Sequence, residues 1–196
     1  MPKPGVLGCL PSLMALFLAD VAASAASAAS AKAEADKPAE VANRGQREAK
    51  DISYGEWQKL CFKAGGAPTL CRTSITGRFP TGQMAVRVDL IEREDSSAAR
   101  LQLFVPVGMY LQQPATLTVD RGKPVRLPYS WCLTNACIAA DVAPPELIKE
   151  MESGQTLVLE VVNSNLLTLA TPVPLTTFTS VRAGAPASVL EQYVDE

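Results

Sequence analysis

The sequence predicts a mainly β fold, an antiparallel β-sandwich or open barrel of about eight short strands with one or two short helices. Residues 83–91 alternate apolar and polar side chains with a period of two, which is typical of a strand with one face on a core. Turn signals rich in glycine and proline separate several such short segments. Four cysteines in the same part of the chain can close two loops through disulfides. We therefore expect a small β domain cross-linked by disulfides.

The first thirty residues have the features of a secretory signal peptide. Lys3 gives a positive start, residues 6–21 are mostly apolar, and the Ala/Ser run that follows offers several small-x-small cleavage sites. A membrane anchor is the alternative, but Pro11, Asp20 and the short apolar run do not suit a span of about 20 residues. We expect residues 1–30 to be removed on export to the periplasm or out of the cell.

Composition divides the remaining chain into three parts. Residues 31–50 mix alanine with charged residues and lack large apolar side chains, so they cannot bury enough surface to offset their ordering entropy. They are predicted to be a flexible linker. The β-rich domain is expected at residues 51–183, and residues 184–196 are expected to form a flexible tail.

Apolar alternation and turn signals mark the elements of this domain in order. Strands are expected at residues 54–62, 69–76, 83–91, 100–105, 115–119, 125–127, 137–142, 155–163 and 166–170. Residues 144–154 predict the main helix, because prolines are tolerated in a first turn and Gly154 is a natural stop. Pro172 and Pro174 are expected to break regular structure before a short amphipathic helix at residues 175–182.

Four cysteines remain once the leader is removed: Cys61, Cys71, Cys132 and Cys137. Three pairings are possible, and the sequence-local one is favoured because each loop is short and rich in turn residues. Each bridge would stabilise the fold by roughly 2–3 kcal/mol. The spacings are looser than those of zinc knuckles, and neither pair has the Cys-x-x-Cys spacing of a redox site. We therefore expect structural disulfides and no metal site.

Aromatic residues near the cysteines and prolines are the candidate contacts. Trp57 and Trp131 each precede a cysteine, which favours structural aromatics packed over the sulfurs within the core. Exposed contacts for a sugar or a protein partner are the alternative for both. Tyr110 and Tyr129 lie near prolines at loop edges and are predicted as candidate surface contacts.

The chain has no histidine, which excludes Ser–His–Asp, Cys–His and histidine-ligated metal chemistry. It has no glycine-rich phosphate loop, and no cofactor is expected. Charges in the domain are balanced and scattered along the sequence, so no basic stripe and no nucleic-acid partner is expected.

Carboxylate chemistry of the glycosidase type is the remaining enzymatic alternative, because it needs only two facing acids. No spacing singles out a pair, and outward strand positions are expected for Asp89 and Glu160. The candidate acids are Asp89, Glu92, Asp120, Asp141 and Glu160.

Taken in order, the motifs resemble the invasion-associated locus B family of exported alphaproteobacterial proteins, over about residues 57–182. They are Trp57…Cys61…Cys71, residues 103–108 (LFVPVG), residues 119–122 (VDRG), Leu127-Pro-Tyr with Cys132…Cys137, Ser153-Gly154, and Pro174-Leu with Phe178. The resemblance implies an exported, disulfide-bonded protein, linked in host-associated members to invasion of host cells. The family has no established catalytic residues.

We therefore expect a non-catalytic binding module in the periplasm or outside the cell, with no membrane span in the mature chain. Its expected partner is a protein or envelope component, or a host surface. The alternatives are a small periplasmic hydrolase that acts on envelope polymers through paired carboxylates, and a ligand-binding β-barrel with an apolar pocket.

Overall fold

The structure is a computed structural model, and it describes residues 43–192. The predicted signal peptide (1–30), most of the predicted linker, and residues 193–196 lie outside this range. Among the residues that are described, no helix is long and apolar enough to cross a membrane.

The described chain forms two β-sheets. The five-stranded sheet has the order β1 (Gly45–Glu48), β12 (Leu167–Pro174), β11 (Thr156–Val162), β7 (Ala115–Val119) and β8 (Val125–Leu127). The eight-stranded sheet has the order β13 (Ser188–Gln192), β3 (Gln58–Ala64), β4 (Leu70–Arg78), β5 (Met84–Arg93), β6 (Arg100–Val105), β10 (Cys137–Val142) and β9 (Tyr129–Cys132), and the short β2 (Ser53–Tyr54) also pairs with β4. Neighbouring strands are antiparallel except for the pairs β1–β12 and β13–β3.

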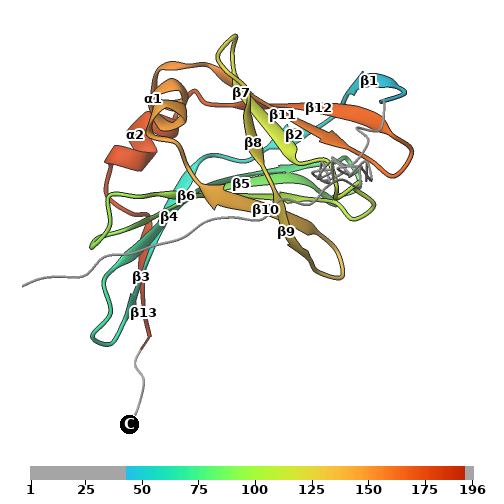
Figure 1. The fold of residues 1–196 in the computed structure, drawn as a ribbon. Coiled ribbons are helices and arrows are strands. Elements are labelled where there is room, and N and C mark those ends of the chain that lie inside the picture. The colour runs from blue at the N-terminus through green and yellow to red at the C-terminus, as the bar shows by residue number, and fades with distance from the viewer. Residues whose placement is uncertain (1–42, 193–196) are drawn as a thin grey trace, which may run out of the picture. The chain divides into compact units, whose positions relative to one another are not determined.

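The two sheets pack face to face around one apolar core (Figure 1). The core takes alternate residues from the central strands, such as Val86, Val88 and Leu90 of β5 and Leu157 and Leu159 of β11. This arrangement confirms the predicted sandwich, with more strands than expected. Buried side chains fill the space between the sheets, so the structure does not support a barrel with an internal apolar pocket.

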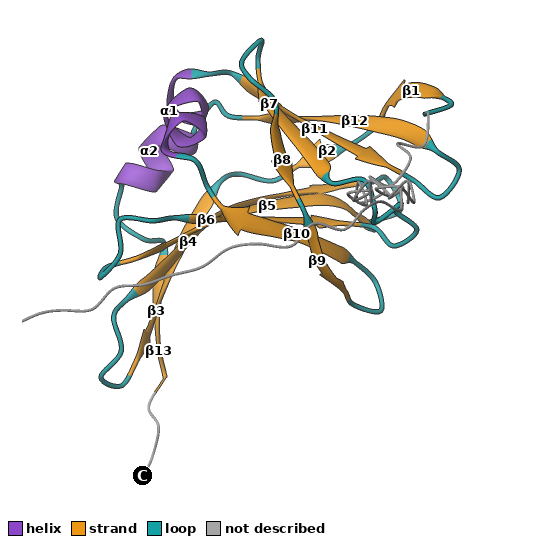
Figure 2. Cartoon of the chain, viewed as in Figure 1, coloured by secondary structure: helices purple, strands orange, loops and turns teal. Residues whose placement is uncertain are grey.

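Two short helices lie together at one end of the sandwich (Figure 2). Helix α1 (Pro145–Ser153) begins with a proline and ends at Gly154, as the sequence predicts, and it buries Leu147 and Met151. Helix α2 (Phe178–Ala183) buries Phe178. No described helix crosses the outer face of the eight-stranded sheet (Figure 2).

The predicted break at Pro172 and Pro174 is wrong, because β12 continues through both residues. Strand β1 pairs only with residues 167–170, so the other side of β12 is an open edge beyond that point. The backbone N–H of Leu175 donates to the carbonyl of Gln155 (2.8 Å), which places both prolines at positions where no N–H faces β11. Their missing donors therefore cost no ladder hydrogen bond.

The structure also differs from the predicted linker and tail. Residues 45–48 form β1 beside β12, within the range that composition predicts to be a linker. Residues 188–192 form β13 beside β3, within the range predicted to be a flexible tail. The side chains of β1 are all exposed, so β1 is held mainly by backbone hydrogen bonds, which composition does not reveal.

Candidate functional site

Both disulfides are present, in the sequence-local pairing. Cys61 and Cys71 are direct partners on β3 and β4, with a Cα–Cα distance of 4.0 Å. Cys132 and Cys137 are direct partners on β9 and β10, at 3.9 Å. Each bridge therefore fixes the register of one hairpin.

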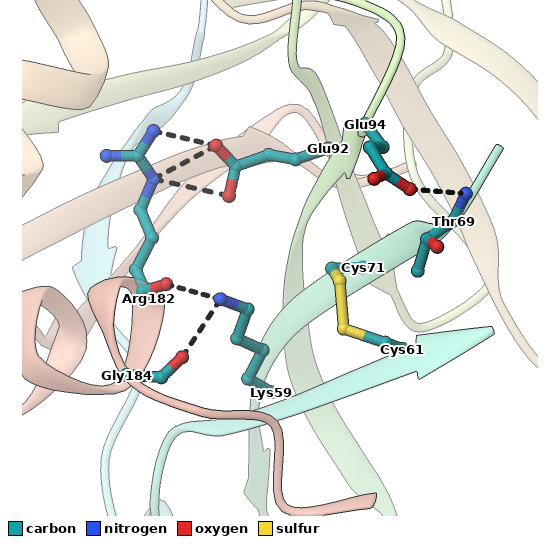
Figure 3. Close-up of a disulfide and its surroundings, with 8 residues drawn as sticks. All are labelled: Lys59, Cys61, Thr69, Cys71, Glu92, Glu94, Arg182 and Gly184. Carbon is teal, nitrogen blue, oxygen red and sulfur yellow. Dashed lines mark hydrogen bonds and ion pairs between the residues drawn. A yellow bond between two sulfur atoms is a disulfide. The ribbon is translucent and has the colours of Figure 1, made fainter. Parts of the chain in front are cut away.

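An open cavity of about 530 Å³ lies beside the Cys61–Cys71 bridge (Figure 3). Strands of the eight-stranded sheet and the end of α2 form its walls. The lining residues are Lys59, Thr69, Cys71, Glu92, Arg93, Glu94, Arg182 and Ala183.

Three of the five charged residues that line this cavity attach α2 to the sheet: Lys59, Glu92 and Arg182. Lys59 Nζ donates to the carbonyls of Arg182 (2.8 Å) and Gly184 (3.0 Å), at the end of α2. The Arg182 guanidinium binds Glu92 (2.7 Å) and also Glu152 of α1. The hydrogen bonds that Arg182 donates to Glu92, and the negative charge of both acids, raise the pKa of Arg182. The arrangement neutralises its own charges, which favours a structural role over a catalytic one.

The two tryptophans have different environments. Trp57 is 4% exposed, donates its indole N–H to the carbonyl of Pro174 (2.8 Å), and contacts the ring of Phe178 edge-on, as a structural aromatic should. Trp131 is 46% exposed, so its predicted burial is wrong. Adjacent residues of a strand point to opposite faces, so Cys132 lies on the side of its partner Cys137 while Trp131 points to the outer face. Cys137 belongs to the core, and Cys132 is exposed at the sheet edge.

The predicted surface contacts of the tyrosines are only partly supported. Tyr129 packs against the core, and its hydroxyl is buried without a hydrogen-bond partner among the described residues, so the prediction for Tyr129 is wrong. It lies opposite Ala139, which faces the core. Tyr110 is half-buried at the start of a loop, where its backbone N–H donates to the carbonyl of Val162 (2.8 Å). A contact role for Tyr110 stays a prediction.

Burial raises the pKa of both Tyr54 and Tyr129 to about 12, from an ordinary value of 10.0. We expect two of the four tyrosines to ionise late when the absorbance of tyrosinate is followed at alkaline pH. Because the unfolded chain loses these protons first, stability should fall as the pH rises from 10 toward 12. A single step near 10 in the folded protein would contradict this expectation.

The candidate carboxylates do not form a catalytic pair in this structure. Asp89 and Glu160 lie on the outer faces of different sheets, and Gln46 donates to Glu160 (2.7 Å). The carboxylate of Asp120 accepts hydrogen bonds from the backbone N–H groups of Gln155 and Thr156. It therefore joins the turn after β7 to the turn between α1 and β11. Asp141 accepts the N–H of the residue that follows it. Glu92 binds Arg182, as described above.

Asp89 is outside the core, as predicted, but it is only 1% exposed. Its two carboxylate oxygens accept hydrogen bonds from Nε and Nη2 of Arg87, each at 2.7 Å. Arg72 approaches from the neighbouring strand, with Nε 4.0 Å from Oδ2. Burial raises the pKa of Asp89, and the two arginines oppose that shift.

Sequence reasoning missed this cluster. Arg87 stacks over the ring of Phe104 (4.9 Å) and Arg72 over the ring of Phe62 (5.4 Å), on the same outer face as Asp89. The scattered charges of the sequence do not reveal this grouping of two arginines around one aspartate. Strand alternation places Arg87 and Asp89 on one side of β5, and that signal could have found half of the cluster.

Exposed apolar side chains gather near the second disulfide. Cys137 pairs with Val105, the last residue of β6, so the Cys132–Cys137 loop and the loop that begins after β6 lie at one end of the sheet. Among the seven large exposed apolar side chains of residues 43–192, three lie within two residues of Val105 or Cys132. We call them the apolar tip: Val107, Trp131 and Leu133.

The model of the invasion associated locus B (IalB) protein family matches residues 57–186. The chain belongs to this family. The crystal structure of invasion associated protein B from Bartonella henselae is similar to the chain, with a TM-score of 0.59 and 22% identity. The similarity covers 66% of this chain and 90% of that chain, and at this identity it supports the fold alone. No curated protein matches the sequence.

The region matched by the family model contains both disulfides, both helices and most of the sandwich, and it excludes β1, β2 and β13. Two motifs that resemble the family in sequence contact each other here. Asp120, in the turn after β7, has a positive φ of 46° and binds the N–H groups that follow Gly154. A Cβ at Gly154 would collide with the side chain of Val119, so this close approach requires glycine.

Proposed function

We propose that this member of the invasion associated locus B family is an exported, non-catalytic binding protein that contacts its partner through the apolar tip. The observation that carries this proposal is that Trp131 and Leu133 are exposed on either side of Cys132, and that Val107 is exposed just beyond Val105, which pairs with Cys137. Contiguous exposed apolar surface marks interaction sites, and tryptophan is enriched among the residues that dominate binding energy.

The disulfide gives the tip a fixed shape before any partner arrives. Leu133 is held in a tight turn, in which its N–H donates to the carbonyl of Ala136 (2.7 Å). Trp131 is part of a strand one residue before the bridge. A contact surface that is already ordered loses less conformational entropy on binding, so a small surface can bind usefully.

Export is supported by the leader-like sequence at residues 1–30 and by the two disulfides, which persist in oxidising compartments. The partner is an envelope component or, in a host-associated organism, a host-cell surface. The names of the family and of the similar protein from Bartonella henselae, which refer to invasion, support the second setting. A non-catalytic role is supported by the lack of histidine and by the separation of the candidate carboxylates.

Chemical crosslinking in intact cells tests this function. We expect the native protein to give a saturable crosslinked species, and the double variant Trp131→Ser/Leu133→Ser to lose most of it. Leu190→Ser is the matched control, because Leu190 is equally exposed but lies on β13 at the opposite edge of the same sheet. Equal crosslinking by the native protein and the tip variant, or no saturable species, would overturn the proposal.

A further inference from the structure

The outer face of the eight-stranded sheet gathers arginine and aromatic side chains. Across the sheet, Arg87, Phe104, Ile138 and Trp131 form one row of directly paired residues on β5, β6, β10 and β9. A second row contains Arg72, Ile91 and Arg100 on β4, β5 and β6. We call this surface the arginine–aromatic face: Phe62, Arg72, Arg87, Arg100, Phe104 and Trp131.

Local contacts hold two of these arginines in place. Asp89 binds Arg87 through both oxygens, and the guanidiniums of Arg87 and Arg72 each stack on a phenylalanine ring. Stacked and paired guanidiniums have little freedom left to lose, so ligand binding costs less entropy.

The face keeps an excess of positive charge. Asp89 is the only carboxylate at an outward position within β4, β5, β6 and β10, and it can neutralise only one of the two arginines beside it. Within residues 43–192, Arg72 has no hydrogen-bond acceptor and its Nε is buried. Arg100 is exposed and has no ion pair in the same range. The complementary ligand is an anion.

The shape of the face indicates what carries that anion. It is a sheet surface with Trp131 exposed at one edge and Phe104 half-exposed two strands away, beyond Ile138. Flat rings and guanidinium planes suit the faces of sugar rings, and guanidinium forks suit carboxylates, as Arg87 and Asp89 show in this structure. A peptide would instead use a long strand edge or side-chain pockets. Strand β9, the edge here, has four residues and a register shift in its pairing.

We propose that the arginine–aromatic face binds an acidic polysaccharide, with Arg72 and Arg100 on its carboxylates and Trp131 against a sugar ring. This inference rests on the proposed binding function and names the chemical class of the partner.

Calorimetric titration with oligogalacturonate tests the inference. We expect the full mature chain to bind this carboxylated oligosaccharide, to lose affinity as salt is raised, and not to bind neutral dextran. The double variant Arg72→Gln/Arg100→Gln should bind about 10-fold more weakly or worse, because charge-assisted hydrogen bonds are lost. Arg126→Gln is the matched control, since Arg126 is an exposed arginine on β8 of the other sheet. It should bind as the native protein does.

Arg87 is left unchanged in this test. Its loss would leave the buried carboxylate of Asp89 without hydrogen-bond donors and would destabilise the fold. The Trp131→Ser variant removes the ring that contacts the sugar and leaves the arginines in place. It should also weaken binding, and the size of the loss gives the contribution of ring stacking. Unchanged affinity in the arginine double variant, or equally tight binding of poly-glutamate, would overturn the inference. If these outcomes occurred while crosslinking in cells still depended on the apolar tip, the polysaccharide would be rejected and the binding function would stand.

Discussion

Replacing Arg87 by alanine is expected to lower the free energy of unfolding by about 3 kcal/mol at neutral pH. Asp89 is 1% exposed, and Arg87 supplies both of its hydrogen bonds. Arg72 is too far away to replace them, at 4.0 Å from the nearest oxygen. The variant would therefore keep a buried carboxylate without donors. Urea denaturation at neutral pH measures the loss.

The pH dependence of this loss identifies its cause. Burial already raises the pKa of Asp89 above 3.8, and removal of Arg87 takes away the largest opposing influence. The folded variant would then bind a proton more readily than the unfolded chain. Its stability should rise as the pH falls from neutral toward 3.8, and its deficit relative to the native protein should shrink. A deficit that is constant over this range would contradict the explanation.

The same strand offers a matched control. Arg93 binds Asp95 with the spacing that joins Arg87 to Asp89, but both partners are about half exposed. Arg93→Ala should cost less than about 1 kcal/mol, since exposed ion pairs contribute little. Adding Asp89→Asn to the Arg87→Ala variant should recover part of the lost stability, because it removes the buried charge.

Strands with strong alternation could be predicted from the sequence, because period two is a local property. The bounds predicted for residues 100–105, 115–119, 125–127 and 137–142 are those of β6, β7, β8 and β10. Edge strands β1 and β13 were missed for the opposite reason. Pairing at an edge depends on backbone groups that every residue except proline carries, so side-chain pattern gives no signal.

The arginine–aromatic face shows a second limit of sequence reasoning. Arg72, Arg87 and Arg100 are far apart in the sequence, and the charge balance of the domain hides them. They share a face only because β4, β5 and β6 are neighbours in one register. Register depends on long-range pairing, and a slip of one residue would move every side chain of a strand to the other face. The exposure of Trp131 was missed for the same reason.

Replacing Phe178 by alanine is expected to lower the free energy of unfolding by about 4 kcal/mol. The side chain is fully buried and its ring lies 4.8 Å from that of Trp57, between centroids. Helix α2 has six residues and cannot persist without this packing. The free energy of unfolding lost in this variant should therefore exceed the loss for a similar truncation in a longer helix or strand, which could relax around the cavity. Thermal and urea denaturation measure it, and the exposed Thr176→Ala in the preceding turn is the control.

The part of the chain that loses protection from hydrogen exchange distinguishes a local effect of Phe178→Ala from a general loss of stability. Lys59 and Glu92 attach the end of α2 to the sheet, and the chain then continues directly into β13. When α2 loosens, the backbone amides of residues 188–192 should exchange hydrogen faster, under conditions in which β9 and β10 keep their native protection. The Cys132–Cys137 bridge lies near the opposite edge of the sheet and should not respond. Uniformly faster exchange across both edges would mean that α2 does not hold β13 in place.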